Sequence, residues 1–308
     1  MFNPTQEVSG YYELGKIIKY AHDHEIDVIV TVNQPFISET MKKEIWNHFR
    51  ACIDEDVDAF LIGDLGVLSI LKSLDKDVKF YASTYMITMN TETVEFLRKL
   101  GFSRVILDRQ LSISEMGHII KNSKVDLEIF VHGGGCSNID GSCYLFHYMF
   151  PGMMKYLSMT TNLYGNPCTL PYDIYDLESN AKLANNVPIM DAFEYCSLCK
   201  LPELIKLGVT GFKIEGRGSN ILYKENTIRI YRELINLLKQ EDLQTFKEKV
   251  ESLKKNFKPA PPSLATLNDM LCSQKRCYYP PLFHSPSKMP ISWQSWTRMQ
   301  FNTLVLLE

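Results

Sequence analysis

The sequence contains none of the short motifs that identify several common enzyme classes. It has no Walker phosphate loop and no Gly-x-Gly-x-x-Gly dinucleotide fingerprint. It also lacks a zinc-protease motif and the Gly-x-Ser-x-Gly elbow of many hydrolases. These absences argue against the nucleotide-binding and hydrolytic classes that are easiest to identify from sequence.

Long apolar runs and an excess of one charge are also missing. The N-terminus is polar and has no apolar signal region, and the longest apolar stretch, Phe60 to Leu71, is interrupted by Asp64 and is too short to cross a bilayer. The net charge of −3 predicts neither a general nucleic-acid binder nor a membrane-surface binder. It does not exclude a local basic patch on the surface. We therefore expect a soluble cytoplasmic protein that does not engage a membrane.

Short apolar runs alternate with amphipathic segments along the 308 residues, without low-complexity runs or a fixed repeat. This alternation predicts a parallel sheet with helical connections. Seven runs are candidate strands: Asp27–Asn33, Asp58–Ile62, Val78–Ser83, Arg104–Leu107, Leu127–Val131, Val187–Met190 and Gly211–Glu215. The expected fold is α/β, a (β/α) TIM-like barrel that opens on a helix, Tyr12–His22, and so lacks its first strand.

The C-terminal part is predicted to form a small extension. A proline-rich linker near Pro259–Pro262 follows the last helical pattern, so we expect a barrel domain over residues 1–257 and an extension over residues 258–308. The late β-like run Phe301–Leu307 either fills the place of the missing first strand or belongs to that extension.

Helix boundaries are marked at three places. Gly101 follows the helical pattern Glu92–Leu100 as a natural C-cap, and Ser112 and Glu115 have the spacing of a capping box. Asp64 follows a strand and either caps the next helix or holds a ligand, and we favour the cap.

Eight cysteines in a reducing compartment are not expected to form a disulfide framework. Four of them converge on a candidate metal site: Cys136, Cys143, Cys168 and Cys196. Four thiolates suit an iron–sulfur cluster or zinc, whereas buried or incidental thiols are the structural alternative. Cys199 is a substitute ligand for Cys196, and Gly133-Gly134-Gly135 would let the backbone fold tightly around an inorganic core.

Polar side chains at the strand ends are the candidate catalytic residues, because a barrel builds its active site at the C-terminal ends of its strands. Arg109, His132 and Glu215 lie at or just past such ends, and Arg217 follows closely. Glu215 and Arg217 bind a substrate or tune a proton transfer, or they form a structural ion pair. His132 is a general acid or base, or a structural histidine hydrogen-bonded to its loop.

Several of these segments together resemble peptidase family U-32, the collagenase-like peptidases. The resemblance rests on Glu128 through Cys136 with Gly141-Ser142-Cys143, on Asn166 through Tyr172, on Cys196 with Leu201 through Ile205, and on Phe212 through Arg217. It covers roughly residues 10–235.

The resemblance implies a cofactor and a reaction. Several members of the family look like iron–sulfur proteins of oxygen-independent hydroxylation, acting on transfer RNA, ribosomal RNA or the ubiquinone ring. By that resemblance Cys136, Cys143, Cys168 and Cys196 hold a 4Fe–4S cluster, with zinc as the alternative. The substrate would be an RNA base or an aromatic small molecule. It would bind in a pocket beside the cluster, and the residues that line this pocket would be Arg109, His132, Glu215 and Arg217.

Two other functions stay open at this point. The family name implies a peptidase, although no protease machinery is visible in the sequence. A third hypothesis is a non-catalytic subunit, stabilised by a cluster or by zinc, whose missing first strand is completed by a partner chain of the same family.

Overall fold

The computed structural model describes residues 7–33, 38–74, 77–134, 139–142, 172–187, 194–216, 221–255 and 305–307. The chain divides into two compact units. Unit 1 comprises Met1–Asp108 and His118–Glu128, and unit 2 comprises Arg109–Gly117 and Ile129–Glu308.

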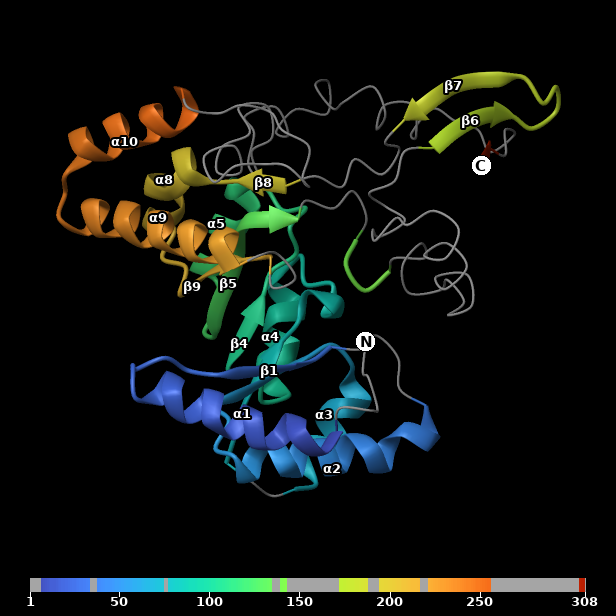
Figure 1. Ribbon diagram of the computed structural model, residues 1–308, viewed down its shortest axis with the longest axis vertical. Coiled ribbons are helices and arrows are strands. Elements are labelled where there is room, and N and C mark those ends of the chain that lie inside the picture. The colour runs from blue at the N-terminus through green and yellow to red at the C-terminus, as the bar shows by residue number, and fades with distance from the viewer. Residues whose placement is uncertain are drawn as a thin grey trace. The chain divides into compact units, whose positions relative to one another are not determined.

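Unit 1 is built on parallel strands in the order of the chain (Figure 1). The strands are β1 (Ile29–Val32), β2 (Ala59–Ile62), β3 (Lys79–Ala82), β4 (Arg104–Ile106) and the first three residues of β5 (Asp126–Gly134). The helices of this unit are α1 (Glu7–His22), α2 (Lys42–Asp54), α3 (Leu65–Lys72) and α4 (Thr91–Lys99), with 3-10 turns at Glu39–Met41 and Thr84–Met86. Helix α5 (Ile113–Lys121) contributes its last four residues, His118–Lys121, to this unit. Strand–helix alternation thus produces the predicted parallel α/β arrangement.

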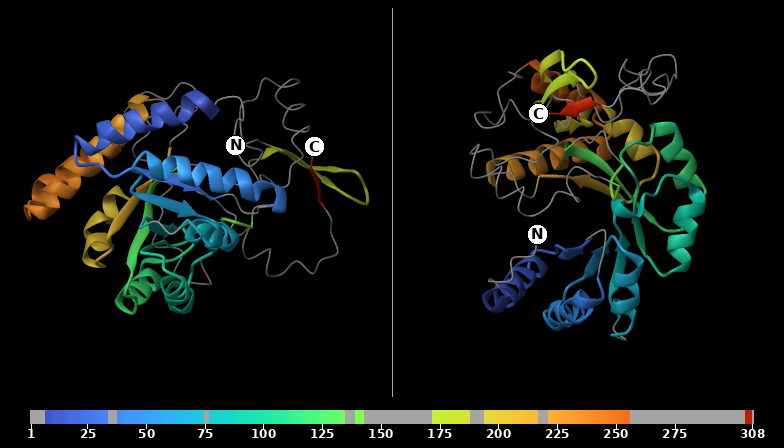
Figure 2. Two further views of the ribbon diagram at one scale, coloured as in Figure 1. Left: turned by 90° about the horizontal axis from the view of Figure 1, so that it is seen from below. Right: turned by 90° about the vertical axis from the view of Figure 1, so that its right-hand side faces the viewer.

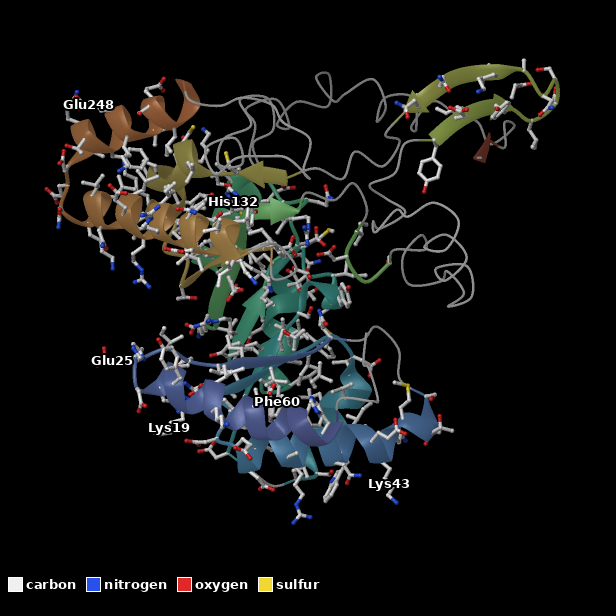
Figure 3. All side chains as sticks on the ribbon, viewed as in Figure 1. Lys19, Glu25, Lys43, Phe60, His132 and Glu248 are labelled. Carbon is white, nitrogen blue, oxygen red and sulfur yellow. The ribbon has the colours of Figure 1, made fainter. Side chains whose placement is uncertain are left out.

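The core of unit 1 lies between its sheet and its helices. Every residue of β2 is buried, as expected for a strand covered on both faces. Phe60 of β2 meets Phe49 of α2 edge to face at 4.7 Å between ring centroids, and both rings are fully buried. Figure 2 shows α1 and α2 next to each other, and Figure 3 labels Phe60.

The predicted helix boundaries are confirmed by their hydrogen bonds. The Asp64 carboxylate accepts from the backbone N–H groups of Gly66 at 2.7 Å and Val67 at 3.1 Å, so it is the N-cap of α3. Ser112 and Glu115 form a reciprocal capping box at 2.8 and 3.2 Å. Gly101, which follows Leu100, the C-cap of α4, has φ +97°, where a residue with a Cβ would be strained.

Unit 2 combines the remainder of β5 with a short antiparallel strand and a helical pair. β5 pairs with β8 (Glu194–Cys196) in antiparallel register and also with β9 (Gly211–Ile214). The 3-10 turn Leu198–Lys200 leads into α8 (Leu201–Lys206), and α9 (Ile221–Lys239) packs against α10 (Leu243–Lys255). A second sheet joins β6 (Tyr172–Asp176) to β7 (Lys182–Val187) and to β10 (Val305–Leu307).

Two predicted strands take different places from those expected. Of the strand predicted at Val187–Met190, Val187 ends β7 of the second sheet, and residues 188–190 lie outside the described part. The strand that joins β5 in this region is β8. β8 has only three residues, too few to produce a recognisable pattern. The late run Phe301–Leu307 contributes β10, which pairs antiparallel with β6 and so takes no place beside β1. Closure of a barrel and the boundary at residue 257 stay predictions, since residues 256–304 lie outside the described part.

Among the described residues, no helix is both long enough and apolar enough to cross a membrane.

Candidate active site

Arg109 is the centre of a buried charged cluster in unit 2. It follows β4 by three residues, and its side chain is 8% exposed. Its guanidinium donates from Nη1 and Nη2 to the two carboxylate oxygens of Glu215, at 3.1 and 3.3 Å, and from Nη2 to Asp140 at 2.7 Å. This forked geometry is the one for which arginine is suited, and it fixes the guanidinium in place.

An aromatic ring supports the same guanidinium from β5. The Arg109 Cζ lies 4.1 Å from the ring centroid of Phe130, and the Nζ of Lys213 lies 5.4 Å from it. Both distances are within the range of cation–π attraction, which is stronger where water is excluded, and Phe130 is 1% exposed. The cluster is therefore held by both charge and stacking.

Gly133 allows β9 to approach β5 closely. The backbone N–H of Glu215 donates to the carbonyl of His132 at 2.8 Å. A Cβ added to Gly133, which has φ +104°, would lie 2.6 Å from the Cβ of Glu215 and 2.9 Å from its carbonyl oxygen. Among the described residues, a glycine is therefore needed at position 133 because Glu215 packs against it. The sequence had suggested another role for this glycine, which was to let the backbone fold around an inorganic core.

His132 is buried at the end of β5, next to α9 (Figure 3). Its Nδ1 lies 3.3 Å from the hydroxyl of Tyr231, and the two rings meet edge to face at 5.4 Å between centroids. Its Nε2 has no hydrogen-bond partner in the part of the chain that the structure describes. The described hydrogen bond of His132 is therefore to a residue of helix α9. The structural role expected from the sequence was a hydrogen bond to the loop that follows His132.

The buried imidazole predicts a loss of stability in acid. Burial lowers the pKa of His132 from 6.5 to about 4, so the unfolded chain takes up this proton more readily than the folded one. Its contribution to stability is complete above pH 6.5 and is lost as the pH falls toward 4. Between pH 7 and pH 5 we expect the free energy of unfolding to fall by about 2 kcal/mol from this group, as measured by urea titration at each pH.

His132→Gln is the comparison variant for that titration. Because glutamine cannot take up the proton, the difference in unfolding free energy between the two proteins should shrink as the pH falls from 7 to 5. Parallel pH dependences for the two proteins would contradict a buried neutral His132.

Cys196 is the one predicted metal ligand that the structure describes. It ends β8, is 2% exposed, and pairs directly with His132 across the strands. Directly opposed residues of antiparallel strands point to the same face, with Cβ atoms about 5 Å apart. Cys136 follows the last residue of β5, Gly134, by two positions in the sequence.

Four other predicted site residues lie outside the described residues: Cys136, Cys143, Cys168 and Arg217. Within the described ranges, no group of three or more histidine, cysteine, aspartate or glutamate side chains could hold a metal ion. The structure thus brings Arg109 together with Glu215, and His132 together with Cys196, and leaves the ligand set as a prediction.

Asp140 and Tyr231 are site residues that the sequence did not reveal. Asp140 lies in the spacer between Cys136 and Cys143, where an acidic residue close to a candidate site was a usable signal. Tyr231 is 99 residues from His132 along the chain and gave no such signal. Only the packing of α9 on β5 brings Tyr231 to the site.

The chain was compared with known proteins. A family model with the description "Peptidase family U32" matches residues 4–263. The "Uncharacterized protease MJ0090" of Methanocaldococcus jannaschii is 30% identical over 255 residues, which are 78% of this chain and 60% of that protein.

Two further relatives are named for RNA. The 23S rRNA 5-hydroxycytidine C2501 synthase of Escherichia coli is 24% identical over 74% of this chain and 34% of its own length. The tRNA hydroxylation protein P1 of Bacillus subtilis is 24% identical over 73% of this chain and 53% of its own length. The chain therefore spans between about a third and three fifths of the length of these three relatives.

Proposed function

Because the chain belongs to peptidase family U32, we propose that it is an iron–sulfur protein that hydroxylates a base of RNA without molecular oxygen. Two relatives carry names that state ribosomal or transfer RNA hydroxylation, which supports this substrate over an aromatic small molecule. Replacing a C–H bond by C–OH with water as the oxygen source releases two electrons and two protons. A 4Fe–4S cluster, when bound, would pass these electrons one at a time to an external electron acceptor.

The observation that carries the proposal is the position of Cys196. A cluster ligand must be a cysteine held in a protected place close to its fellow ligands. Cys196 is buried, and it pairs with β5, the strand from whose end the sequence reaches Cys136 in two residues. This placement fits a thiolate ligand, and Cys143 and Cys168 would complete the set.

The charged cluster would orient the substrate. In the TIM-like (β/α) barrel that we propose as the scaffold, the catalytic face is at the C-terminal ends of the strands. Arg109 follows β4 and Glu215 follows β9, so both are at such ends. Glu215 is 31% exposed while Arg109 is 8% exposed, so the carboxylate is the member that a substrate reaches, and Arg109 holds it. Arg217, two residues beyond Glu215, would contact the substrate as well.

Anaerobic metal analysis tests the cofactor. We expect a brown protein with about four irons per chain, since one 4Fe–4S cluster contains four. Cys196→Ala should lose most of this iron, whereas Cys199→Ala should retain it. A colourless protein without iron after anaerobic reconstitution would refute the cluster, and zinc in its place would support the alternative metal.

Cys52→Ala is the matched control for the loss of a thiol. Burial raises the pKa of the Cys52 thiol to about 12, so this cysteine stays protonated, and a protonated thiol is a poor metal ligand. We expect Cys52→Ala to keep the iron content of the wild type. Loss of iron in this variant as well would show that the assay responds to general destabilisation.

Nucleoside mass spectrometry tests the reaction. RNA from cells that express the protein should contain a nucleoside heavier by one oxygen atom, and cells with Cys196→Ala should lack it. A purified protein that instead cleaves gelatin would support the peptidase hypothesis. A native mass that includes a second chain of the family, without activity of this chain alone, would support the partner-subunit hypothesis.

A further inference from the structure

The Tyr231 hydroxyl joins three groups at the proposed cluster site. Tyr231 lies on α9 and is 2% exposed. Its hydroxyl lies 2.6 Å from the carbonyl oxygen of Val131, 3.1 Å from the backbone nitrogen of Ser197 and 3.3 Å from Nδ1 of His132. Ser197 directly follows Cys196, so one hydroxyl links β5 to the residue after the proposed ligand.

The protons at this hydroxyl can be assigned from chemistry alone. A carbonyl oxygen only accepts, so the Tyr231 hydroxyl must donate its single proton to Val131. A backbone N–H only donates, so Ser197 occupies one lone pair of the hydroxyl oxygen. The remaining lone pair can only accept, and His132 must therefore donate to it from Nδ1.

The assignment leaves the other ring nitrogen of His132 without a proton. A neutral imidazole has one N–H, and the nitrogen that carries it is set by the hydrogen bond it makes. Nε2 therefore carries a lone pair, and this atom has no partner among the described residues although the side chain is buried. A buried acceptor without a donor is costly unless a ligand or substrate provides one.

We propose that Tyr231 is a positioning residue, which fixes His132 in the Nδ1–H tautomer and so presents a bare Nε2 beside Cys196 as an acceptor for an N–H or O–H group of the substrate. The direct pairing of His132 with Cys196 places the two side chains on one face of the strands. The tautomer follows from this chain's hydrogen bonds alone, whereas the role of Nε2 toward a substrate depends on the function proposed above.

Nitrogen NMR of the histidine rings tests the tautomer in the 308-residue chain without iron. The chain has seven histidines, and the His132 signals are assigned as those that vanish in His132→Gln. We expect the wild type to show a protonated Nδ1 and an unprotonated Nε2. Tyr231→Phe removes the acceptor of Nδ1 and keeps the ring, so the proton should move to Nε2.

Tyr223→Phe is the matched control for that variant. Tyr223 lies on the same helix, and its ring centroid is 6.0 Å from that of His132. Loss of its hydroxyl should leave the proton of His132 on Nδ1. A wild-type protein with the proton on Nε2, or an unchanged tautomer in a folded Tyr231→Phe, would overturn the inference.

The reduction potential tests the placement of Nε2 in the protein reconstituted with iron. Once Tyr231→Phe moves the proton to Nε2, the positive end of that N–H dipole lies on the same face of the strands as Cys196. A positive dipole end near a cluster stabilises its reduced, more negative form and so raises the potential. We therefore expect a higher potential in Tyr231→Phe than in the wild type or Tyr223→Phe. An unchanged potential after a switched tautomer would overturn the placement beside Cys196. A protein that binds no cluster would refute the proposed function and leave the NMR result to decide the tautomer.

Discussion

Arg109→Ala is expected to lower the free energy of unfolding by about 3 kcal/mol. The substitution removes a guanidinium that is 8% exposed and leaves the carboxylates of Glu215 and Asp140 close together without their cation. Breaking a buried ion pair on one side costs about 3–5 kcal/mol, and the lower end applies because Glu215 is 31% exposed to water. Chemical denaturation at neutral pH measures the change.

Arg98→Ala is the matched control for Arg109→Ala. Arg98 donates to Glu95 at 2.6 and 2.8 Å within α4, which is also a paired geometry, but its side chain is 38% exposed. Solvent screens the attraction between Arg98 and Glu95, so the free energy of unfolding of Arg98→Ala should differ little from that of the wild type. Equal losses in the two variants would contradict a special role for burial in the Arg109 cluster. Arg109→Lys should recover only part of the stability, since an ammonium group cannot form the fork.

Gly133→Ala is expected to be the most destabilising single substitution considered, by about 4 kcal/mol. Alanine at φ +104° is strained, which costs about 1–3 kcal/mol. Its Cβ would also lie 2.6–3.0 Å from the Cβ and the backbone carbonyl group of Glu215, and relieving such a clash costs about another 1–3 kcal/mol. Thermal or chemical unfolding gives the total.

Gly208→Ala separates the two causes. Gly208 also has a positive φ, +81°, but nothing lies within 4 Å of the Cβ that alanine would add. We therefore expect Gly208→Ala to show only the strain and to lose roughly half as much stability as Gly133→Ala. If the two glycines respond equally, the close approach of Glu215 to β5 is not the cause. Gly133→Ala should also bind less iron than Gly208→Ala, because Gly133 lies in β5 and the predicted ligand Cys136 follows that strand in the sequence.

Local features of the fold could be predicted because they depend on residues close together in the sequence. The capping box of Ser112 and Glu115 and the N-cap at Asp64 each join residues at most three positions apart. Likewise the apolar run at β2 identifies a buried strand by itself. The resemblance to family U-32 depended on short segments of the same kind, and the family match to residues 4–263 confirmed it.

The candidate site was predictable in some of its members, whereas Asp140, Tyr231 and the contacts between the residues were not. Arg109 and Glu215 follow β4 and β9, as expected from the sequence, whereas His132 lies within the last three residues of β5 and not after it. The sequence offered Arg217 as an ion-pair partner of Glu215, and this pair stays a prediction because Arg217 lies outside the described residues. The structure pairs Glu215 with Arg109, 106 residues away, which the sequence did not indicate. A given arginine could pair with any of many carboxylates in the sequence. The spacing of residues along the chain does not show which carboxylate the fold places within hydrogen-bond distance.

The sequence by itself determined the parallel α/β arrangement, the helix caps and the family of this protein, because periodicity, capping and short motifs act over a few residues. The tertiary structure decided that β8 runs antiparallel beside β5, that Asp140 joins the Arg109 cluster, and that Tyr231 holds His132. Those contacts join residues 31–99 positions apart, so they form only when strands and helices have packed.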